Sequence, residues 1–367
     1  MDDRVYMKMA LELAEKGRGF VNPNPMVGSV IVKDNAVIGS GFHERYGSFH
    51  AERNALNGRE HWPQGSVLYV TLEPCCHHGK TPPCTDIIID KNISKVVIGT
   101  LDPNPLVRGK GVEILRSRGI EVEVGVMEEE CLKLNEVFFH FILRKTPFTV
   151  MKYAMSIDGK IACANGESKW ITGEKARRKV HEDRHNYSAI MAGIGTVLRD
   201  DPLLNCRIEG RKNPVRIVCD SSLRLPMQSR LVHTAGEIPT ILATCCTDEK
   251  KYDHYIEAGL DIICTPSKKG RVDLKVLMEE LGRRKIDSLL LEGGGCLNWS
   301  ALNEGIVHRV QAYISPKILG GAQAKTPVSG EGVTHPDRAF FLTRPEVKII
   351  GRDVLLESEV VHCSQES

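Results

Sequence analysis

The stretch Val70-Thr71-Leu72-Glu73-Pro74-Cys75, read with His50-Ala51-Glu52 before it and Pro83-Cys84 after it, is the most informative part of this sequence. One imidazole and two thiolates provide three protein ligands for Zn²⁺ and leave the fourth tetrahedral position to water, which is typical of a catalytic site. A bound Zn²⁺ lowers the pKa of its water towards neutrality. A carboxylate that is not a ligand must then move the protons, and Glu52 is available for this.

The same residues predict local structure. In the middle of a helix, residues two apart point to different sides. At the first turn both His50 and Glu52 can point into one cleft, so we expect a helix to begin near His50. Cys84 follows Pro82 and Pro83, which favours a second helix start, where the helix-end charge stabilises a thiolate.

The H-x-E and P-C…C arrangement is typical of zinc-dependent nucleobase deaminases, although those usually have two residues between the cysteines and this chain has eight. The alternatives are a structural zinc site or cysteines that merely end strands. A structural site usually has four protein ligands and has no need of Glu52. Cys76, His77 and His78 could compete as ligands, but a residue next to Cys75 in an extended segment points the other way.

Composition sets wider limits. The chain has 367 residues, which predicts about two domains. Hydrophobic residues make up 41% and charged residues 26%, as in ordinary globular proteins. A net charge of +2 argues against a basic nucleic-acid surface, and no apolar run is long enough to span a membrane. Twelve cysteines spread along a chain without a secretory pattern at its start predict reduced thiols and a cytoplasmic enzyme.

Alternating strands and helices predict an α/β domain with a mostly parallel sheet in the first half. The expected helices start near Tyr6, His50, Cys84, Gly111 and Met127, and the expected strands are Val27–Val32, Ala36–Ile38, Val67–Leu72, Lys95–Thr100 and Ile120–Val124. Pro147 ends this pattern and a β-rich run follows it, so we place the domains at 1–146 and 147–367.

The second half predicts another α/β domain. Its expected strands are Phe148–Met155, Ala189–Gly193, Val215–Asp220, Thr240–Cys245, Asp261–Cys264, Ser288–Glu292 and Val310–Ser315, and its main helices are Glu174–Tyr187 and Leu274–Arg284. The strand before Glu292 leads into Gly293-Gly294-Gly295, which favours a phosphate-binding loop at a helix start, with a tight turn that binds nothing as the alternative. The glycine spacing is not that of a Rossmann fold.

Short segments around these motifs form a longer pattern. In the first half they are Asn22-Pro23-Asn24-Pro25, Val27-Gly28, Gly79-Lys80-Thr81-Pro82-Pro83-Cys84 and Asp102-Pro103-Asn104-Pro105. In the second half they include Ala154-Met155-Ser156-Ile157-Asp158-Gly159-Lys160, Ser168-Lys169-Trp170, Gly195-Thr196-Val197, Asp200-Asp201-Pro202 and Ser315-Pro316-Lys317. From about Tyr6 to Leu356 the chain resembles the bifunctional riboflavin biosynthesis protein family, which fuses a pyrimidine deaminase to a reductase and has the long cysteine spacing.

For the first half, the resemblance implies a cytidine-deaminase-like α/β/α domain. His50, Cys75 and Cys84 would hold one Zn²⁺, Glu52 would be the catalytic proton shuttle, and Asn24 would bind the substrate. The implied reaction is hydrolytic removal of the 2-amino group of 2,5-diamino-6-ribosylamino-4(3H)-pyrimidinone 5′-phosphate. On spacing alone, Asn24 is equally well explained as a turn residue between two prolines.

For the second half, the resemblance implies a dihydrofolate-reductase-like α/β domain that uses NADPH to reduce the ribosyl group to a ribityl chain. The implied cofactor contacts are Ala154, Trp170, Thr196, Asp200, Ser221, Gly294, Gly295, Cys296, Leu297, Asn298, Trp299 and Ser300. The implied substrate contacts are Ser168, Arg184, Leu204, Arg207 and Glu292. Neither the preference for NADPH over NADH nor a general acid follows from the residues themselves.

These features predict an enzyme with a small phosphorylated pyrimidine substrate, no nucleic-acid or membrane partner, and a homo-oligomeric state. A second hypothesis is a cytidine or tRNA deaminase fused to an unrelated α/β domain. A third is a zinc-stabilised binding module, for which metal removal would unfold the first domain.

Overall fold

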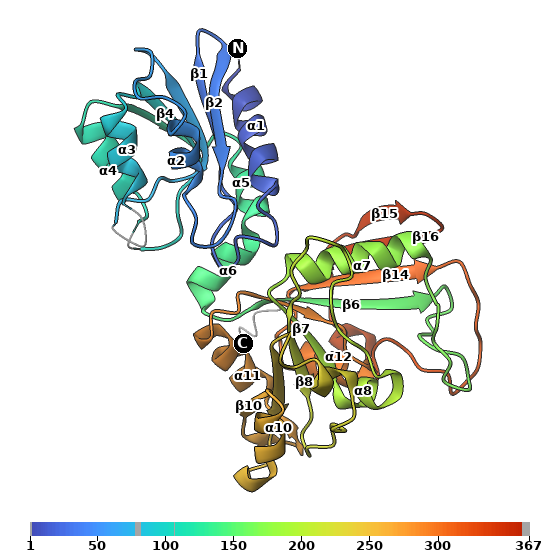
Figure 1. Cartoon of the computed structure of the whole chain (residues 1–367). Helices are drawn as coiled ribbons and strands as arrows, with labels where there is room; N and C mark the ends of the chain where they lie inside the picture. Colours follow the sequence, from blue (N-terminus) through green and yellow to red (C-terminus); the bar gives the residue numbers. More distant parts are fainter. Residues whose placement is uncertain (1, 78–81, 106, 362–367) are drawn as a thin grey trace. The chain divides into compact units, whose positions relative to one another are not determined.

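The computed structural model describes residues 2–77, 82–105 and 107–361. The chain divides into two compact units, Met1–Lys145 and Thr146–Ser367, each with its own sheet (Figure 1). Within the described ranges, no helix is long and apolar enough to cross a membrane.

The N-terminal unit consists, in chain order, of α1 (Asp3–Glu15), β1 (Gly28–Lys33), β2 (Ala36–Phe42), α2 (Ala51–Leu56), β3 (Val67–Leu72), α3 (Cys84–Asp90), β4 (Lys95–Thr100), α4 (Lys110–Ser117), β5 (Glu121–Val124), α5 (Glu128–Leu134) and α6 (Glu136–Arg144). The strand order is β2-β1-β3-β4-β5. Strands β3, β4 and β5 run parallel, but β1 pairs antiparallel with both β2 and β3. The sheet is therefore mixed, and the expectation of a mostly parallel sheet was wrong.

The mixed sheet results from the hairpin between β1 and β2. Its two turn residues, Asp34 and Asn35, have φ of 49° and 63°, a left-handed conformation that two-residue hairpin turns require and that Asp and Asn tolerate. Strand β1 of the hairpin lies beside β3 and runs in the opposite direction, so the parallel part of the sheet begins only at β3.

Two helical layers cover this sheet because successive strand residues face opposite sides. In β1, Val30 packs with residues of α1 and α5, whereas its neighbour Ile31 packs with residues of α2, α3 and α4. The fit against α1 is tight: a Cβ at Gly28 would lie 1.9 Å from the Ala10 carbonyl oxygen. The result is an α/β/α unit with the helix starts of α2 and α3 on one face.

The C-terminal unit consists of β6 (Phe148–Ser156), α7 (Glu174–Asn186), β7 (Ala189–Gly193), α8 (Ile194–Asp200), β8 (Val215–Cys219), α9 (Arg230–His233), β9 (Thr240–Thr244), η1 (Glu249–Lys251), α10 (Asp253–Glu257), β10 (Asp261–Cys264), β11 (Ser267–Lys268), β12 (Arg271–Val272), α11 (Leu274–Arg283), β13 (Ser288–Leu291), α12 (Gly295–Asn303), β14 (Arg309–Ser315), η2 (Pro336–Arg338), β15 (Glu346–Ile350) and β16 (Asp353–Glu359). Its sheet has the order β10-β9-β8-β7-β13-β6-β14-β16-β15. All pairs from β10 to β14 are parallel, and the two pairs made by β16 are antiparallel.

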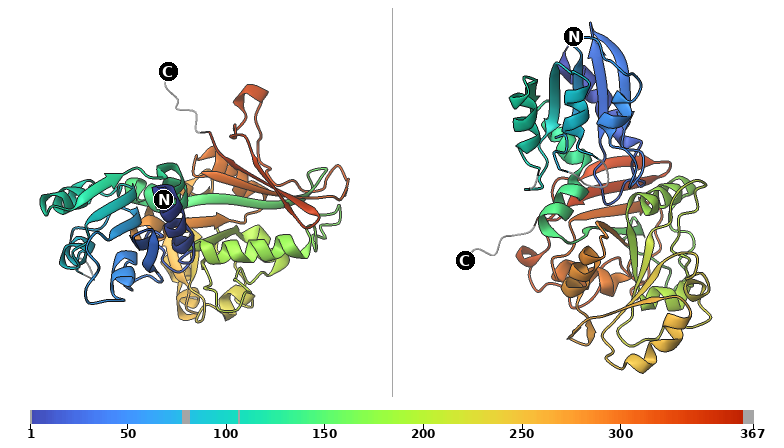
Figure 2. Two further views of the ribbon diagram at one scale, coloured as in Figure 1. Left: turned by 90° about the horizontal axis from the view of Figure 1, so that it is seen from above. Right: turned by 60° about the vertical axis from the view of Figure 1, so that its left-hand side comes forward.

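Helices cover both faces of the parallel part. Residues of α11 and α12 pack on one face, and residues of α8, α9 and α10 on the other. At the β15 end of the sheet, α7 lies against β14 and β16 (Figure 2). Ala176 of α7 packs there with Tyr313 of β14 and Leu355 of β16. Ligands of open parallel sheets bind beyond the carboxyl ends of the strands, and in this unit that edge carries the loops after β6, β7, β8 and β13.

Candidate active sites

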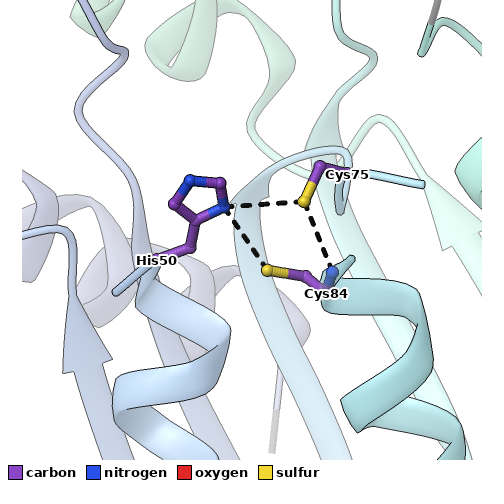
Figure 3. Close-up of side chains that lie close together, drawn as sticks. All are labelled: His50, Cys75 and Cys84. Carbon is purple, nitrogen blue, oxygen red and sulfur yellow. Dashed lines mark hydrogen bonds between the residues drawn. The ribbon is translucent and has the colours of Figure 1, made fainter. Parts of the chain in front are cut away.

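The zinc ligands predicted from the sequence lie together in the N-terminal unit. His50 is the residue before α2, Cys84 is the first residue of α3, and Cys75 lies in the loop after β3. Figure 3 shows the three side chains pointing towards one another. His50 Nδ1 is 3.5 Å from the Sγ atoms of both cysteines, and one ligand atom of each residue lies within 4.8 Å of the others.

This arrangement fits zinc. Tetrahedral Zn²⁺ with Zn–N of about 2.0 Å and Zn–S of about 2.3 Å separates nitrogen from sulfur by roughly 3.5 Å, which is the separation found here. The Cys84 backbone N–H donates to Cys75 Sγ at 3.3 Å, as expected where a helix start faces a thiolate. Hydrogen bonds from Cys84 and His50 lower the pKa of the Cys75 thiol.

Two of the competing ligands, Cys76 and His77, do not join this cluster. Among the described residues, His50, Cys75 and Cys84 are the only group of three or more metal-binding side chains close enough to share an ion. His77 is exposed, and Cys76 follows Cys75 in the chain without entering the group. His78, like the nearby segment Gly79-Lys80-Thr81, lies outside the described residues.

Glu52 lies in the first turn of α2 and is 3% exposed. Burial raises its pKa to about 7. A carboxyl group with a pKa near neutrality can both accept and donate a proton, as a proton shuttle must. Both helix starts expected from the sequence, at His50 and at Cys84, are confirmed.

A cavity of about 330 Å³ opens beside these residues, and Asn24 and His43 line it with Glu52. His43 Nδ1 lies 3.0 Å from the Phe49 carbonyl oxygen, so Nδ1 carries the hydrogen and donates. Burial lowers the pKa of His43. In the neutral tautomer with its hydrogen on Nδ1, Nε2 accepts a hydrogen bond from Asn24 Nδ2 at 3.1 Å. The side-chain amide oxygen of Asn24, Oδ1, therefore remains an acceptor for a ligand.

Asp102 forms another wall of this cavity. Burial raises its pKa to about 6, and it accepts a hydrogen bond from Asn104 N at 2.8 Å. Behind it the buried Glu73 carboxylate accepts four backbone hydrogen bonds, from Asp102, Gly109, Gly111 and Val112. The sequence motifs predicted no role for His43 or Glu73. The only feature of the sequence that pointed to Glu73 is its position directly before Pro74-Cys75.

In the C-terminal unit a buried charge cluster follows β13. Arg184 donates to Glu292 with two parallel bonds, Nε to Oε1 at 2.8 Å and Nη2 to Oε2 at 3.0 Å. Lys152 Nζ donates to the same carboxylate at 3.0 Å. Although burial disfavours the charged carboxylate, the two cations hold the pKa of Glu292 well below its ordinary value. Lys152 was missed as a member of this cluster because its partner lies 140 residues away.

Two adjoining cavities meet at this cluster, one of about 1110 Å³ and one of about 810 Å³, and Ile161, Ser168 and Glu292 line both. Of the cofactor and substrate contacts expected from the family resemblance, the larger cavity brings together Ser168, Thr196, Asp200, Ser221, Glu292, Gly294, Gly295, Cys296, Leu297 and Ser300. The smaller cavity brings together Ala154, Ser168, Trp170, Arg184, Arg207 and Glu292.

Three of the expected contacts lie outside both cavity walls. Leu204 is 3% exposed and packs in the core. Asn298 is fully buried and donates to the Pro327 carbonyl, while the Trp299 ring packs against Phe340. The helical period explains the last two, since positions 298 and 299 of α12 turn away from the face that 296, 297 and 300 present.

The glycine loop has the features of an anion site. Gly294 is the residue before α12, no side chain caps the helix, and its first turn carries no acidic residue. A Cβ at Gly295 would lie 2.6 Å from Ser329 Oγ, so the close packing of this loop requires glycine. Uncapped N–H groups at a helix start that lines a large cavity suit a phosphate of a dinucleotide.

Two family models match this chain. The model described as the cytidine and deoxycytidylate deaminase zinc-binding region matches residues 1–100. The model described as the RibD C-terminal domain matches residues 147–356.

Curated relatives and solved structures match over nearly the whole length. Riboflavin biosynthesis protein RibD of Actinobacillus pleuropneumoniae is 52% identical over 361 residues, covering 98% of this chain and 96% of the relative. RibD of Acinetobacter baumannii superposes with a TM-score of 0.88 at 35% identity, covering 98% and 99%. A diaminohydroxyphosphoribosylaminopyrimidine deaminase/5-amino-6-(5-phosphoribosylamino)uracil reductase of Thermotoga maritima superposes with a TM-score of 0.85 at 41% identity, covering 97% and 98%.

Proposed function

Because the chain belongs to the RibD family of riboflavin biosynthesis proteins, zinc- and NADPH-dependent enzymes that combine a deaminase with a reductase, we propose that its two sites act in turn on one pyrimidine ribosyl phosphate. The N-terminal site removes the 2-amino group of 2,5-diamino-6-ribosylamino-4(3H)-pyrimidinone 5′-phosphate. The C-terminal site then reduces the ribosyl group to give 5-amino-6-ribitylamino-uracil 5′-phosphate. The observation that carries the proposal is the His50, Cys75 and Cys84 cluster beside the buried Glu52.

In the deaminase step, Zn²⁺ held by His50, Cys75 and Cys84 would supply a water of lowered pKa. Glu52 would accept a proton from that water and pass it to the pyrimidine ring nitrogen. After the hydroxyl group has added to C2, Glu52 would take the proton of that hydroxyl group and give it to the departing amino group, which leaves as ammonia while the C2 carbonyl forms. Its pKa of about 7 suits both directions of transfer. Asn24, held by His43, accepts a hydrogen bond from the substrate and orients it.

In the reductase step, NADPH supplies the hydride. Opening the ribose ring leaves a C1′=N bond, so the hydride adds to C1′ and a proton must add to the nitrogen. Lys152 Nζ lies on the wall of the smaller cavity and donates a hydrogen bond to Glu292, so we assign the delivery of this proton to Lys152. Arg184 already uses Nε and Nη2 on Glu292, which leaves the exposed Arg207 for the substrate phosphate.

We also propose that the chain forms a homo-oligomer through the open end of the second sheet. On the face opposite α7, Val347 and Ile349 of edge strand β15 are 59% and 72% exposed. Leu356 of β16 pairs with Val347, and Ala312 of β14 pairs with Leu356, so the apolar row continues from edge strand β15 towards the middle of the sheet. Exposed apolar rows of this kind mark protein interfaces. Sedimentation should find a dimer or larger species, and Ile349→Glu should shift it towards monomer. A monomeric wild type would refute the assignment.

The cytoplasm is the expected location, because no disulfide joins the cysteines of the described ranges, and disulfides are rare in reducing compartments.

Ammonia release and NADPH oxidation, followed together with the diaminopyrimidinone ribosyl phosphate, test the proposed function. Wild type should give both signals. Glu52→Gln keeps the shape of the side chain but cannot shuttle protons, so ammonia release should fall by roughly 10²- to 10⁴-fold. With the already deaminated substrate, the same variant should oxidise NADPH at the wild-type rate. If zinc-loaded wild type releases no ammonia, the substrate assignment fails, and cytidine or tRNA would be tried next.

A further inference from the structure

A row of polar side chains crosses the second sheet beneath α7. Lys152 of β6 pairs with Gln311 of β14, and Gln311 pairs with Glu357 of β16. Paired residues of neighbouring strands point to the same face, which here is the α7 face, because Tyr313 packs against α7 and lies two residues after Gln311. Glu292, directly after β13, accepts a hydrogen bond from Lys152 on its other side. Lys152 therefore lies between two polar neighbours.

The hydrogen bonds at Glu357 fix the orientation of the Gln311 amide. Gln311 Nε2 donates to Glu357 Oε1 at 2.9 Å, and Lys348 Nζ donates to Glu357 Oε2 at 2.6 Å. A carboxylate only accepts hydrogen bonds, so the amide nitrogen of Gln311 must face Glu357 and the amide oxygen must face away from it. Gln311 is 2% exposed, so this orientation is held inside the protein.

The amide oxygen of Gln311 lacks a hydrogen-bond partner. Oε1 is buried, and none of the residues that the structure describes donates to it. Buried acceptors in folded proteins are nearly always satisfied, and an exception indicates an unseen water, an ion or a functional role. Glutamine at this position therefore costs stability unless a donor reaches Oε1 during the reaction.

Three lysines lie near the row, and one of them can supply this donor. Lys179 of α7 and Lys348 of β15 are both paired with carboxylates. Lys152 is the register neighbour of Gln311, with about 5 Å between the two strands. Its hydrogen bond to Glu292 at 3.0 Å uses one of the three N–H donors of an ammonium group. Lys152 is thus the donor best placed for Gln311 Oε1.

Two flanking acceptors would give the Lys152 ammonium a single direction. Strand β6 lies between β13 and β14, so Glu292 and Gln311 approach Lys152 from opposite sides. When both accept from the ammonium, its third N–H is directed away from the sheet, into the smaller cavity that Lys152 lines. A lysine held by Glu292 alone can turn about that one hydrogen bond and presents its proton in many directions.

We propose that Gln311 is a positioning residue of the reductase site, whose amide oxygen accepts a second hydrogen bond from Lys152 and so directs the remaining N–H to the substrate nitrogen. As C1′ takes up the hydride, one proton passes from Lys152 to that nitrogen, and water in the open cavity later replaces it. Glu357 keeps the Gln311 amide in the required orientation. The inference rests on the proposed reductase function and adds the residue that directs its proton donor.

Gln311→Leu in the full chain tests the inference, because leucine has a similar volume and no acceptor. In single turnovers with NADPH and the deaminated substrate, the rate at saturation should fall by roughly 10- to 100-fold, the effect of losing a hydrogen bond to a charged group. The substrate concentration that gives half of this rate should stay the same, since the described residues that line the cavity do not include Gln311. Ammonia release belongs to the other unit and should be unchanged.

A paired exchange tests the orientation of the amide. Gln311→Glu combined with Glu357→Gln keeps the hydrogen bond between the two positions, with donor and acceptor exchanged, and keeps an oxygen next to Lys152. This double variant should restore most of the rate that Gln311→Leu loses. A purely structural role of Gln311 would instead lower the melting temperature of the C-terminal unit in Gln311→Leu and leave the rate unchanged.

Tyr313→Phe is the matched variant. It removes a buried hydroxyl group from the same strand and face, where Tyr313 donates to Asp183 at 3.3 Å, but its register neighbour on β6 is Ala154. This variant should keep the wild-type rate. The inference is overturned if Gln311→Leu keeps the wild-type rate, if it changes only the half-saturating substrate concentration, or if Tyr313→Phe slows the reaction equally. A wild type that oxidises no NADPH with the deaminated substrate would refute the reductase function itself, and the inference with it.

Discussion

The Glu73 carboxylate is expected to be a main support of the deaminase unit, and Glu73→Gln tests this. Oε1 accepts from Gly111 N at 3.0 Å and Val112 N at 3.3 Å, and Oε2 from Gly109 N at 3.0 Å and Asp102 N at 3.3 Å. Glutamine replaces one oxygen with an NH₂ group, so two buried N–H donors lose their acceptor and face another donor. At about 1–3 kcal/mol for each unsatisfied group, the loss is about 4 kcal/mol.

The measurement is the urea midpoint of the full chain, combined with the temperature at which each activity is half lost. In Glu73→Gln, the temperature at which ammonia release is half lost should be at least about 8 °C below that of wild type, since 1 kcal/mol shifts Tm by about 2–4 °C in a unit of this size. NADPH oxidation in the same sample should keep its wild-type profile, because that unit has its own core. Glu113→Gln is the control, an exposed carboxylate on the same helix α4. A Glu73→Gln variant within 0.5 kcal/mol of wild type, the usual range of surface substitutions, would refute the reasoning.

Three further predictions concern other parts of the molecule. The pKa of Glu292 in the folded chain lies below its ordinary value of 4.5, so the contribution of Glu292 to folding stability is complete above that value and is lost as the pH falls below it. The difference in unfolding free energy between wild type and Glu292→Gln should therefore shrink on acidification. A pH-independent difference would contradict this. Gly28→Ala should destabilise the N-terminal unit by about 1–3 kcal/mol because its Cβ meets the Ala10 carbonyl. Gly58→Ala, with open space around it, is the control for calorimetry, and equal Tm values would contradict the tight α1 contact. A chelator should abolish ammonia release while the far-UV circular dichroism stays largely unchanged, because the core around the sheet does not depend on the metal. Loss of the helix and strand signal in that spectrum would favour the zinc-stabilised binding module.

Much of the zinc site could be predicted from the sequence because its chemistry is local. His50 and Glu52 share one helix start, and Cys84 begins another, as expected. The family resemblance drawn from these motifs is confirmed by the full-length relatives. Strands such as Val67–Leu72 and Ala189–Gly193 were predicted to the residue, since a fully buried strand is a continuous apolar run.

What the sequence did not predict depends on distant partners. Lys152 becomes chemically distinctive only beside Glu292, 140 residues away, and His43 only beside Asn24. Strand β15 was not expected, because four of its five residues are exposed and the apolar signal of a buried strand is missing. Hairpin β1–β2 was foreseen, but not its antiparallel pairing with β3, since pairing order follows from tertiary contacts.

Each unit of this chain has a separate sheet and a separate core. Mutations that damage one half therefore need not affect the other, and each half can accumulate changes at its own rate. In a genetic setting, a chain defective only in deamination and a chain defective only in reduction should complement each other when both are expressed in one cell, with the deaminated pyrimidine passing between them. Fusion of the two halves then guarantees equal amounts of both activities, which two separate genes would have to achieve through regulation.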